Sequence, residues 1–240
     1  MPIEFLLVPA GAFLGALAVG AAGFGDALIA AALWLHIMGP REAVPLLVAT
    51  GLVIHLIPLL RLHRALDYSR LMPFLVGGTL GVPVGSWLLG IADPAVFRAG
   101  VGGFLVIYSL VFLFRPPQGG FAAGGRAADG AIGLVGGVLG GLAGLSGIVP
   151  TVWSALRGWS RAEQRGIFQP FILAMHGMAL AWLAWGGMVD AGTAINFLWC
   201  LPGIAAGSWL GLKLYGRLDD KQFQRIVLVL LLVLGAILLI

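Results

Sequence analysis

Charged residues are scarce in this 240-residue chain. Asp, Glu, Lys and Arg make up only 10% of it, hydrophobic types make up 60%, and the mean hydropathy is +1.03. A soluble domain carries roughly 25% charged residues, so this chain cannot cover itself with a surface that water accepts. We therefore expect a multi-pass protein of the lipid bilayer. The net charge of +4 does not indicate a nucleic-acid partner, because its basic residues cluster in short loops that set topology.

Cysteine pairs, alternating strand patterns and catalytic clusters are also lacking. The one cysteine, Cys200, excludes a disulfide within the chain. The apolar runs are long and do not alternate, which excludes a porin-like barrel and predicts an all-α fold. We find no paired carboxylates, no Cys/His metal cluster and no nucleotide-binding loop. The sequence therefore predicts neither an enzyme nor a cofactor or metal site.

Ten apolar segments are present, five on each side of a stretch rich in Gly and Pro. They fall near 5–21, 24–38, 43–60, 71–90, 95–114, 130–143, 147–157, 164–185, 192–213 and 223–240. The two halves repeat each other: Gly25 matches Gly147 and Gly85-Ser86-Trp87 matches Gly207-Ser208-Trp209 at a shift of 122 residues. His55 matches His176 at a shift of 121. We predict a first repeat over 1–116, a linker over 117–129 and a second repeat over 130–240.

The loop charges predict that the two repeats have opposite orientations. The loop 61–70 is basic, whereas its counterpart, 186–192, has no Lys or Arg. The loop 90–94 has none either, whereas its counterpart contains Lys213, Arg217, Lys221 and Arg225. Because basic short loops stay in the cytoplasm, equivalent loops lie on opposite sides. Inverted repeats of about five segments each satisfy this pattern and place both termini outside.

Each repeat begins with glycine-rich arms that are short for a membrane crossing. The stretch 130–157 leaves about 14 residues for each arm, whereas a straight crossing needs roughly 20. We expect broken, hairpin-like helices that turn at 22–25 and 144–147, because glycine permits tight turns and close packing. Two half-helix ends that meet near the midplane can direct backbone N–H groups at an anion.

The start of each repeat resembles the sulfite exporter TauE/SafE (TSUP) family. The residues that carry the resemblance are Gly20-Ala-Ala-Gly-Phe-Gly-Asp-Ala-Leu28 and Gly140-Gly-Leu-Ala-Gly-Leu-Ser-Gly-Ile-Val-Pro150. It extends over almost the whole chain as a duplicated unit. The resemblance implies transport of sulfite, organosulfonates or other small sulfur-containing or carboxylate anions. Many members have a fuller glycine run followed by proline and leucine, where the first copy here has Asp26-Ala-Leu28.

Candidate substrate-binding residues lie at the two turns and on the helices that follow them. They are His55, His176, Gly23, Phe24, Gly25, Gly144, Ser146, Gly147 and Gln169. Imidazole holds an anion as the cation or shuttles a proton, and ionisable groups within a membrane usually serve function. The alternative is that the two histidines join helices structurally. Gln169 precedes His176 by seven residues, so the two share a helix face; its alternative is an interhelical hydrogen bond. The alternative for Ser146 is that it caps a helix rather than donating to an anion.

Three further groups have two interpretations each. Asp26 opposes an anion unless it is protonated or paired, so a proton- or ion-coupling role shared with His55 and His176 suits it better than substrate binding; the alternative is a helix cap. Arg165 either snorkels toward the basic end or guides substrate. For the repeated Gly-Ser pairs we favour close helix packing over binding.

These features together predict a secondary transporter for small anions in the inner membrane. It would work by alternating access between two inverted halves and would be coupled to protons or to the membrane potential. The alternatives are a passive anion channel and a membrane-embedded assembly factor. The expected partners are the small anion and the bilayer, and a homodimer is left open.

Overall fold

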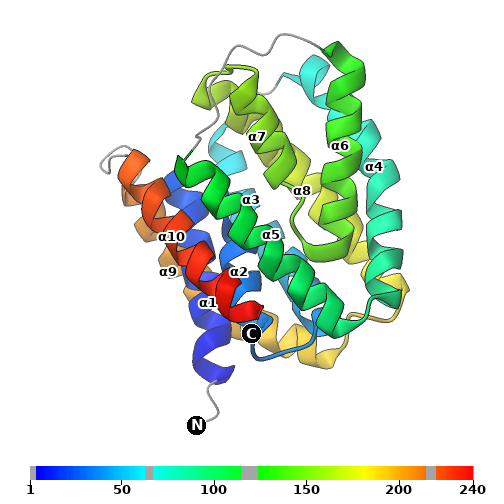
Figure 1. Ribbon diagram of the computed structural model, residues 1–240, viewed down its shortest axis with the longest axis vertical. Helices are drawn as coiled ribbons and strands as arrows, with labels where there is room; N and C mark the ends of the chain where they lie inside the picture. The colour runs from blue at the N-terminus through cyan, green and yellow to red at the C-terminus, as the bar shows by residue number, and fades with distance from the viewer. Residues whose placement is uncertain (1–3, 63–66, 115–123, 215–219, 240) are drawn as a thin grey trace.

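The computed structural model describes residues 4–62, 67–114, 124–214 and 220–239. Within these ranges the chain forms ten α-helices and no strand, which confirms the all-α prediction. The helices are α1 (Glu4–Ala22), α2 (Asp26–Trp34), α3 (Pro40–Leu62), α4 (Tyr68–Ile91), α5 (Pro94–Phe114), α6 (Gly125–Ala143), α7 (Ile148–Leu156), α8 (Arg161–Trp185), α9 (Ala191–Leu214) and α10 (Asp220–Leu238). In Figure 1, α1, α2, α9 and α10 gather on one side, and α4, α6, α7 and α8 gather on the other.

Five helices are long and apolar enough to cross a membrane. Their spans are Pro40–Ile57, Tyr68–Ile91, Pro94–Phe114, Glu163–Trp185 and Ala191–Leu214. Shorter apolar stretches lie in α1 and α10. Many large apolar side chains on these helices remain exposed, as is expected where lipid rather than water surrounds the protein. The chain is therefore a multi-pass membrane protein.

Side-chain caps begin four of the helices. Asp67 accepts a hydrogen bond from the N–H of Arg70 at the start of α4, and Asp93 accepts from the first turn of α5. Ser160 and Glu163 form a capping box at the start of α8. Asp190 accepts from the N–H of Thr193 at the start of α9. Such caps satisfy N–H groups that lack a partner within the helix, so the chain reverses direction between long apolar helices with few unsatisfied groups.

The two short helices run back along the helices that precede them. At the far end of α2, Nε1 of Trp34 donates to the carbonyl of Val8 near the start of α1, at 3.1 Å. In α7, Nε1 of Trp153 donates to Oδ1 of Asp129 near the start of α6, at 2.7 Å. One indole therefore holds the returning arm in each half of the chain.

Two helix pairs pack so closely that glycine is required along their contact. In each pair the residue numbers rise together along both helices, so the two helices run in the same direction. A methyl group on any of these glycines would lie under 3.0 Å from a backbone carbonyl oxygen of the partner helix. The glycines are Gly77, Gly81 and Gly85 of α4 against α6, and Gly203, Gly207 and Gly211 of α9 against α1. The four-residue spacing is the small-residue pattern of membrane helix contacts.

The repeated Gly-Ser-Trp sequences take part in these contacts, as the packing interpretation predicts. Gly85 lies against the backbone of α6, and Gly207 lies against the backbone of α1. The neighbouring Trp87 and Trp209 point outward, with exposed fractions of 62% and 64%. In both Gly-Ser-Trp sequences the glycine therefore contacts another helix, whereas the tryptophan is exposed.

Polar contacts gather at the two ends of the helix bundle. At one end, Arg126 donates to Oγ of Ser69 at 2.8 Å, and Arg70 forms an ion pair with Glu163 at 3.0 Å. At the opposite end, Arg41 donates to the carbonyl of Gly90 and Arg98 donates to that of Met38. The first end, which we call the basic end, contains the beginnings of α4, α6 and α8.

The predicted linker 117–129 lies partly outside the described residues, which resume at 124. Helix α6 begins at Gly125, five residues before the apolar segment expected near 130. Its polar first turns are held at the basic end, because Arg126 bonds to Ser69 and Asp129 bonds to Trp153. Hydropathy alone does not detect such turns, since their stability comes from neighbouring helices.

Candidate functional site

Two breaks between helices bring glycine-rich turns together inside the protein. The first break separates Ala22 of α1 from Asp26 of α2, and the second separates Ala143 of α6 from Ile148 of α7. Gly25 has φ of 104° and Gly144 has φ of 70°. Residues other than glycine rarely adopt these left-handed backbone conformations. The chain therefore interrupts its helices at glycines that permit the turn, at the positions expected from the two glycine-rich motifs.

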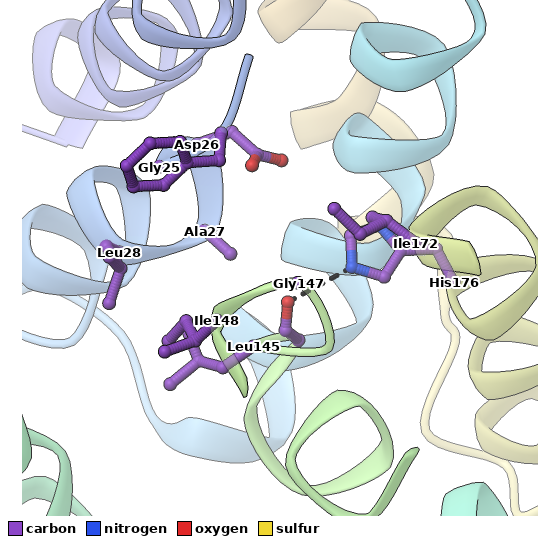
Figure 2. A pocket seen from close by; sticks show the side chains of 11 residues that line it. Gly25, Asp26, Ala27, Leu28, Leu145, Gly147, Ile148, Ile172 and His176 are labelled. Carbon is purple, nitrogen blue, oxygen red and sulfur yellow. Dashed lines mark hydrogen bonds between the residues drawn. The ribbon is translucent and has the colours of Figure 1, made fainter. Parts of the chain in front are cut away.

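A small cavity lies between the two breaks. Its volume is about 20 Å³, which is room for about one water molecule. Figure 2 shows that the carboxylate of Asp26 and the ring of His176 approach it from different elements. The lining residues are Phe24, Gly25, Asp26, Ala27, Leu28, Gly144, Leu145, Gly147, Ile148, Ile172 and His176.

The first turns of α2 and α7 both contribute to the cavity wall. Each of these helices has nine residues and begins at the break that precedes it. The first N–H groups of a helix have no partner within it, and the helix dipole makes this end partly positive. The N-terminal ends of two helices from different halves of the chain therefore border the same small cavity.

A buried hydrogen-bonded chain joins the first break to α3 and α8. Nε2 of Gln169 donates to the carbonyl of Gly23 at 2.7 Å. Oε1 of the same amide lies 2.7 Å from Nδ1 of His55, and Nε2 of His55 lies 3.1 Å from Oδ1 of Asp26. His55 and Gln169 are fully buried. The chain fixes the turn at Gly23 and gives Asp26 a partner within the protein.

His176 lies beside this chain and has a different environment. Its Nε2 lies 3.0 Å from the carbonyl of Gly144, at the second break. Its Nδ1 is buried and has no hydrogen-bond partner among the described residues. The rings of His55 and His176 meet edge to face, with centroids 5.9 Å apart. The two matched histidines thus come together at the centre of the protein, one in contact with each turn.

Gly51 of α3 lies against the side chains of His176 and Asp26, and the sequence alone did not indicate it. A methyl group on Gly51 would lie under 3.0 Å from Nδ1 of His176 and 3.3 Å from Oδ2 of Asp26. Only glycine leaves room for both side chains there. The chain has 38 glycines, and no motif distinguishes this one, so only the packing of α3 against α8 identifies it.

The predicted site residues fall into two groups. Six line the cavity: Phe24, Gly25, Asp26, Gly144, Gly147 and His176. The other four, Gly23, Ser146, His55 and Gln169, lie behind its wall. Gly23, His55 and Gln169 belong to the hydrogen-bonded chain, whereas Ser146 packs against Gly140 of α6, and its Oγ has no partner in the described part of the chain.

Helix α8 presents a row of four side chains from the basic end toward the cavity. Arg165, Gln169, Ile172 and His176 follow one another at intervals of four, three and four residues, which places them on one helix face. The guanidinium of Arg165 lies beside Gly23, and its Nη2 is 3.5 Å from the carbonyl of Ala21. Arg165 therefore contacts the first turn, and both interpretations of this residue stay predictions.

Acidic, histidine and cysteine side chains are distributed over residues 4–62, 67–114, 124–214 and 220–239. Within these ranges no three His, Cys, Asp or Glu residues are grouped so as to hold a metal ion. Of the buried acidic and histidine side chains in the described residues, Asp26, His55 and His176 lie near the two turns, whereas Asp129 lies near the start of α6.

Comparison with known proteins places this arrangement in a family. The family model described as "Sulfite exporter TauE/SafE" matches residues 7–238, nearly the whole chain. The match includes both turns, both histidines and every helix of the bundle. No curated protein and no solved structure matches the chain.

Proposed function

The chain belongs to the sulfite exporter TauE/SafE family, a family of membrane transporters, and on that premise we propose that it is a secondary carrier for small anions. Its substrates would be sulfite, organosulfonates or related sulfur-containing or carboxylate anions. It would move them across the inner membrane by alternating access. An ion gradient or the membrane potential, rather than ATP hydrolysis, would drive it through Asp26, His55 and His176.

The observation that carries this proposal is the convergence of two positive helix ends on one buried cavity. The first residues of α2 and α7 and the side chain of His176 line this cavity, and the first N–H groups of a helix have no partner within it. The one carboxylate in the wall, Asp26, is already engaged by His55 at 3.1 Å. A small oxyanion suits such a site, because it accepts several hydrogen bonds and is attracted to helix N-termini.

Matching architecture of the two halves supports inverted repeats that begin with re-entrant hairpins. Helices α1 to α5 have 19, 9, 23, 24 and 21 residues, and α6 to α10 have 19, 9, 25, 24 and 19. The closest packing also exchanges between halves: α1 lies on α9, and α6 lies on α4. Under this proposal each half lends its hairpin to a helix of the other half.

The size of the cavity supports alternating access. A space of about 20 Å³ holds about one water molecule, whereas sulfite has four heavy atoms. We infer that the two turns move apart to admit the anion. The glycine contacts of α1 with α9 and of α4 with α6 favour movement of each pair as a unit, because close-packed interfaces resist continuous deformation.

Uptake of radiolabelled sulfite into proteoliposomes tests the proposed function. We expect saturable uptake that stops when the cavity is blocked by Gly147→Leu, because a methyl group there already lies under 3.0 Å from Ile172. Gly100→Leu on α5 is the control, since nothing lies within 4 Å of its added Cβ. Unsaturable fluxes accompanied by large currents would instead indicate a channel, and no flux of any small anion would refute transport at this site.

Cysteine labelling tests the inverted topology. Replacing Cys200 with alanine removes the chain's only cysteine, after which Ser69→Cys and Ala191→Cys each offer one thiol at an exposed position. We expect a membrane-impermeant maleimide to label Ala191→Cys in intact cells and Ser69→Cys only after the membrane is opened, because the basic end faces the cytoplasm. Labelling of both thiols from the same side would contradict the inverted arrangement.

A further inference from the structure

The two matched histidines differ in how their ring nitrogens are engaged. Both nitrogens of His55 have partners, Gln169 and Asp26. His176 has one partner, the carbonyl of Gly144, and its Nδ1 is buried without a partner among the described residues. The two histidines therefore differ in where a further proton can bind: both ring nitrogens of His55 are engaged, whereas Nδ1 of His176 is not.

The hydrogen bonds around His55 fix how many protons it shares with Asp26. The carbonyl of Gly23 can only accept, so Nε2 of Gln169 donates to it and Oε1 of Gln169 faces His55. This oxygen must accept in turn, so Nδ1 of His55 carries a proton. The contact of Nε2 with Asp26 holds one more proton between the two groups. Whichever atom carries that proton, the pair His55 and Asp26 has a formal charge of zero.

The same reasoning leaves one vacant proton site on His176. The carbonyl of Gly144 can only accept, so Nε2 of His176 carries the ring proton and Nδ1 is a bare lone pair. This nitrogen lies next to the space that a side chain on Gly51 would fill, and Oδ2 of Asp26 borders the same space. Nδ1 of His176 and the Asp26 carboxylate that lines the cavity therefore border the same small space.

Few other charged groups face this nitrogen. Helix α2 contributes Asp26 and α3 contributes His55, which form the neutral pair. Helices α6 and α7 contribute no titratable side chain to the cavity wall. On α8 itself, Arg165 lies about three turns toward the basic end, beside Gly23. The wall of the cavity thus has no net charge until His176 takes up a proton.

Burial makes an anion and this proton depend on each other. A buried anion without a counter-charge is costly, and so is a buried imidazolium. Bound together they cancel. We propose that the protein is a proton–anion symporter in which Nδ1 of His176 takes up one proton with each monovalent anion. The N–H bond forms when both enter from one side and breaks when both leave on the other, so each cycle moves no net charge. This inference rests on the proposed carrier function.

The decisive experiment measures the driving force for methanesulfonate, which stays monovalent across the accessible pH range. We expect vesicles with an alkaline interior to accumulate it against its gradient and an imposed potassium-diffusion potential to have no effect. A pH-sensitive dye should report one proton per methanesulfonate. Uptake driven by the potential without proton movement would overturn the inference and leave the carrier function intact. Uptake of sulfite but not of methanesulfonate would also overturn the inference. No uptake of either anion would overturn both the inference and the proposed carrier function.

The variant His176→Gln separates proton binding from structure, because its amide can still donate to Gly144 but cannot take up a proton at neutral pH. We expect pH-driven accumulation to fall at least about 100-fold, and any residual uptake to become sensitive to the membrane potential. His36→Gln, at an exposed position between α2 and α3, should behave as wild type. Accumulation by His176→Gln equal to wild type would overturn the inference. If the variant does not fold, the proton count on the wild-type protein decides alone.

Discussion

Transport should slow strongly when Gly51 is replaced by alanine. The added methyl group would lie under 3.0 Å from both Nδ1 and Cε1 of His176, so the ring must turn away and lose its bond to Gly144. Overpacking of this kind costs about 1–3 kcal/mol in stability. Displacement of a functional group by about 1 Å lowers rates about 100-fold, and we expect a loss of that size in the rate of anion uptake by proteoliposomes.

Gly177→Ala is the matched control for this prediction. Gly177 is the next residue of α8 after His176, and a methyl group there would meet only Leu52 at an ordinary 3.8 Å. Its uptake should equal that of wild type. Adding His176→Ala to Gly51→Ala removes the clash and should restore thermal stability but not transport. If Gly51→Ala alone transports at half the wild-type rate or better, the position of His176 does not limit the cycle.

Much of the fold follows from the sequence because lipid imposes a simple rule. Every backbone polar group in the bilayer needs an internal partner, so apolar runs become helices, and their number is readable from hydropathy. The breaks before Asp26 and Ile148 were also predictable, since glycines such as Gly25 and Gly144 adopt conformations that other residues avoid. The start of α6 at Gly125 was not, because its polar first turns are stabilised by other helices.

The site could be predicted only in part, because several of its contacts depend on how the helices pack against one another. His55, His176 and Asp26 stand out because ionisable residues are rare in apolar helices, and the seven-residue spacing placed Gln169 on the face of His176. The bond of His55 to Asp26 depends on how α2 packs against α3, which no spacing encodes. Gly51 carries no side-chain signal at all. Ser146 has a side chain of the right chemistry, but the turn directs it to Gly140 of α6.

Because Asp26 and His55 form a neutral pair, we expect His55→Gln to lower anion affinity more than Asp26→Asn does. In His55→Gln the amide can still donate to Gln169, but Asp26 loses the proton shared with His55 and becomes an uncompensated carboxylate in the cavity wall. Two like charges 4 Å apart repel by about 4 kcal/mol at an effective dielectric constant of 20. Anion affinity should therefore fall by about three orders of magnitude.

Asp26→Asn should cause a much smaller loss, within about 10-fold, because an asparagine amide can donate to Nε2 of a neutral His55 while Nδ1 still donates to Gln169. It should also rescue His55→Gln, since the double variant returns the cavity wall to a formal charge of zero. Methanesulfonate uptake and its KM measure all three variants, with melting temperatures to confirm folding. If Asp26→Asn alone abolishes proton-coupled uptake, or fails to rescue His55→Gln when the protein is folded, then the Asp26 carboxylate itself carries the coupling proton. In that case the neutral-pair assignment is wrong.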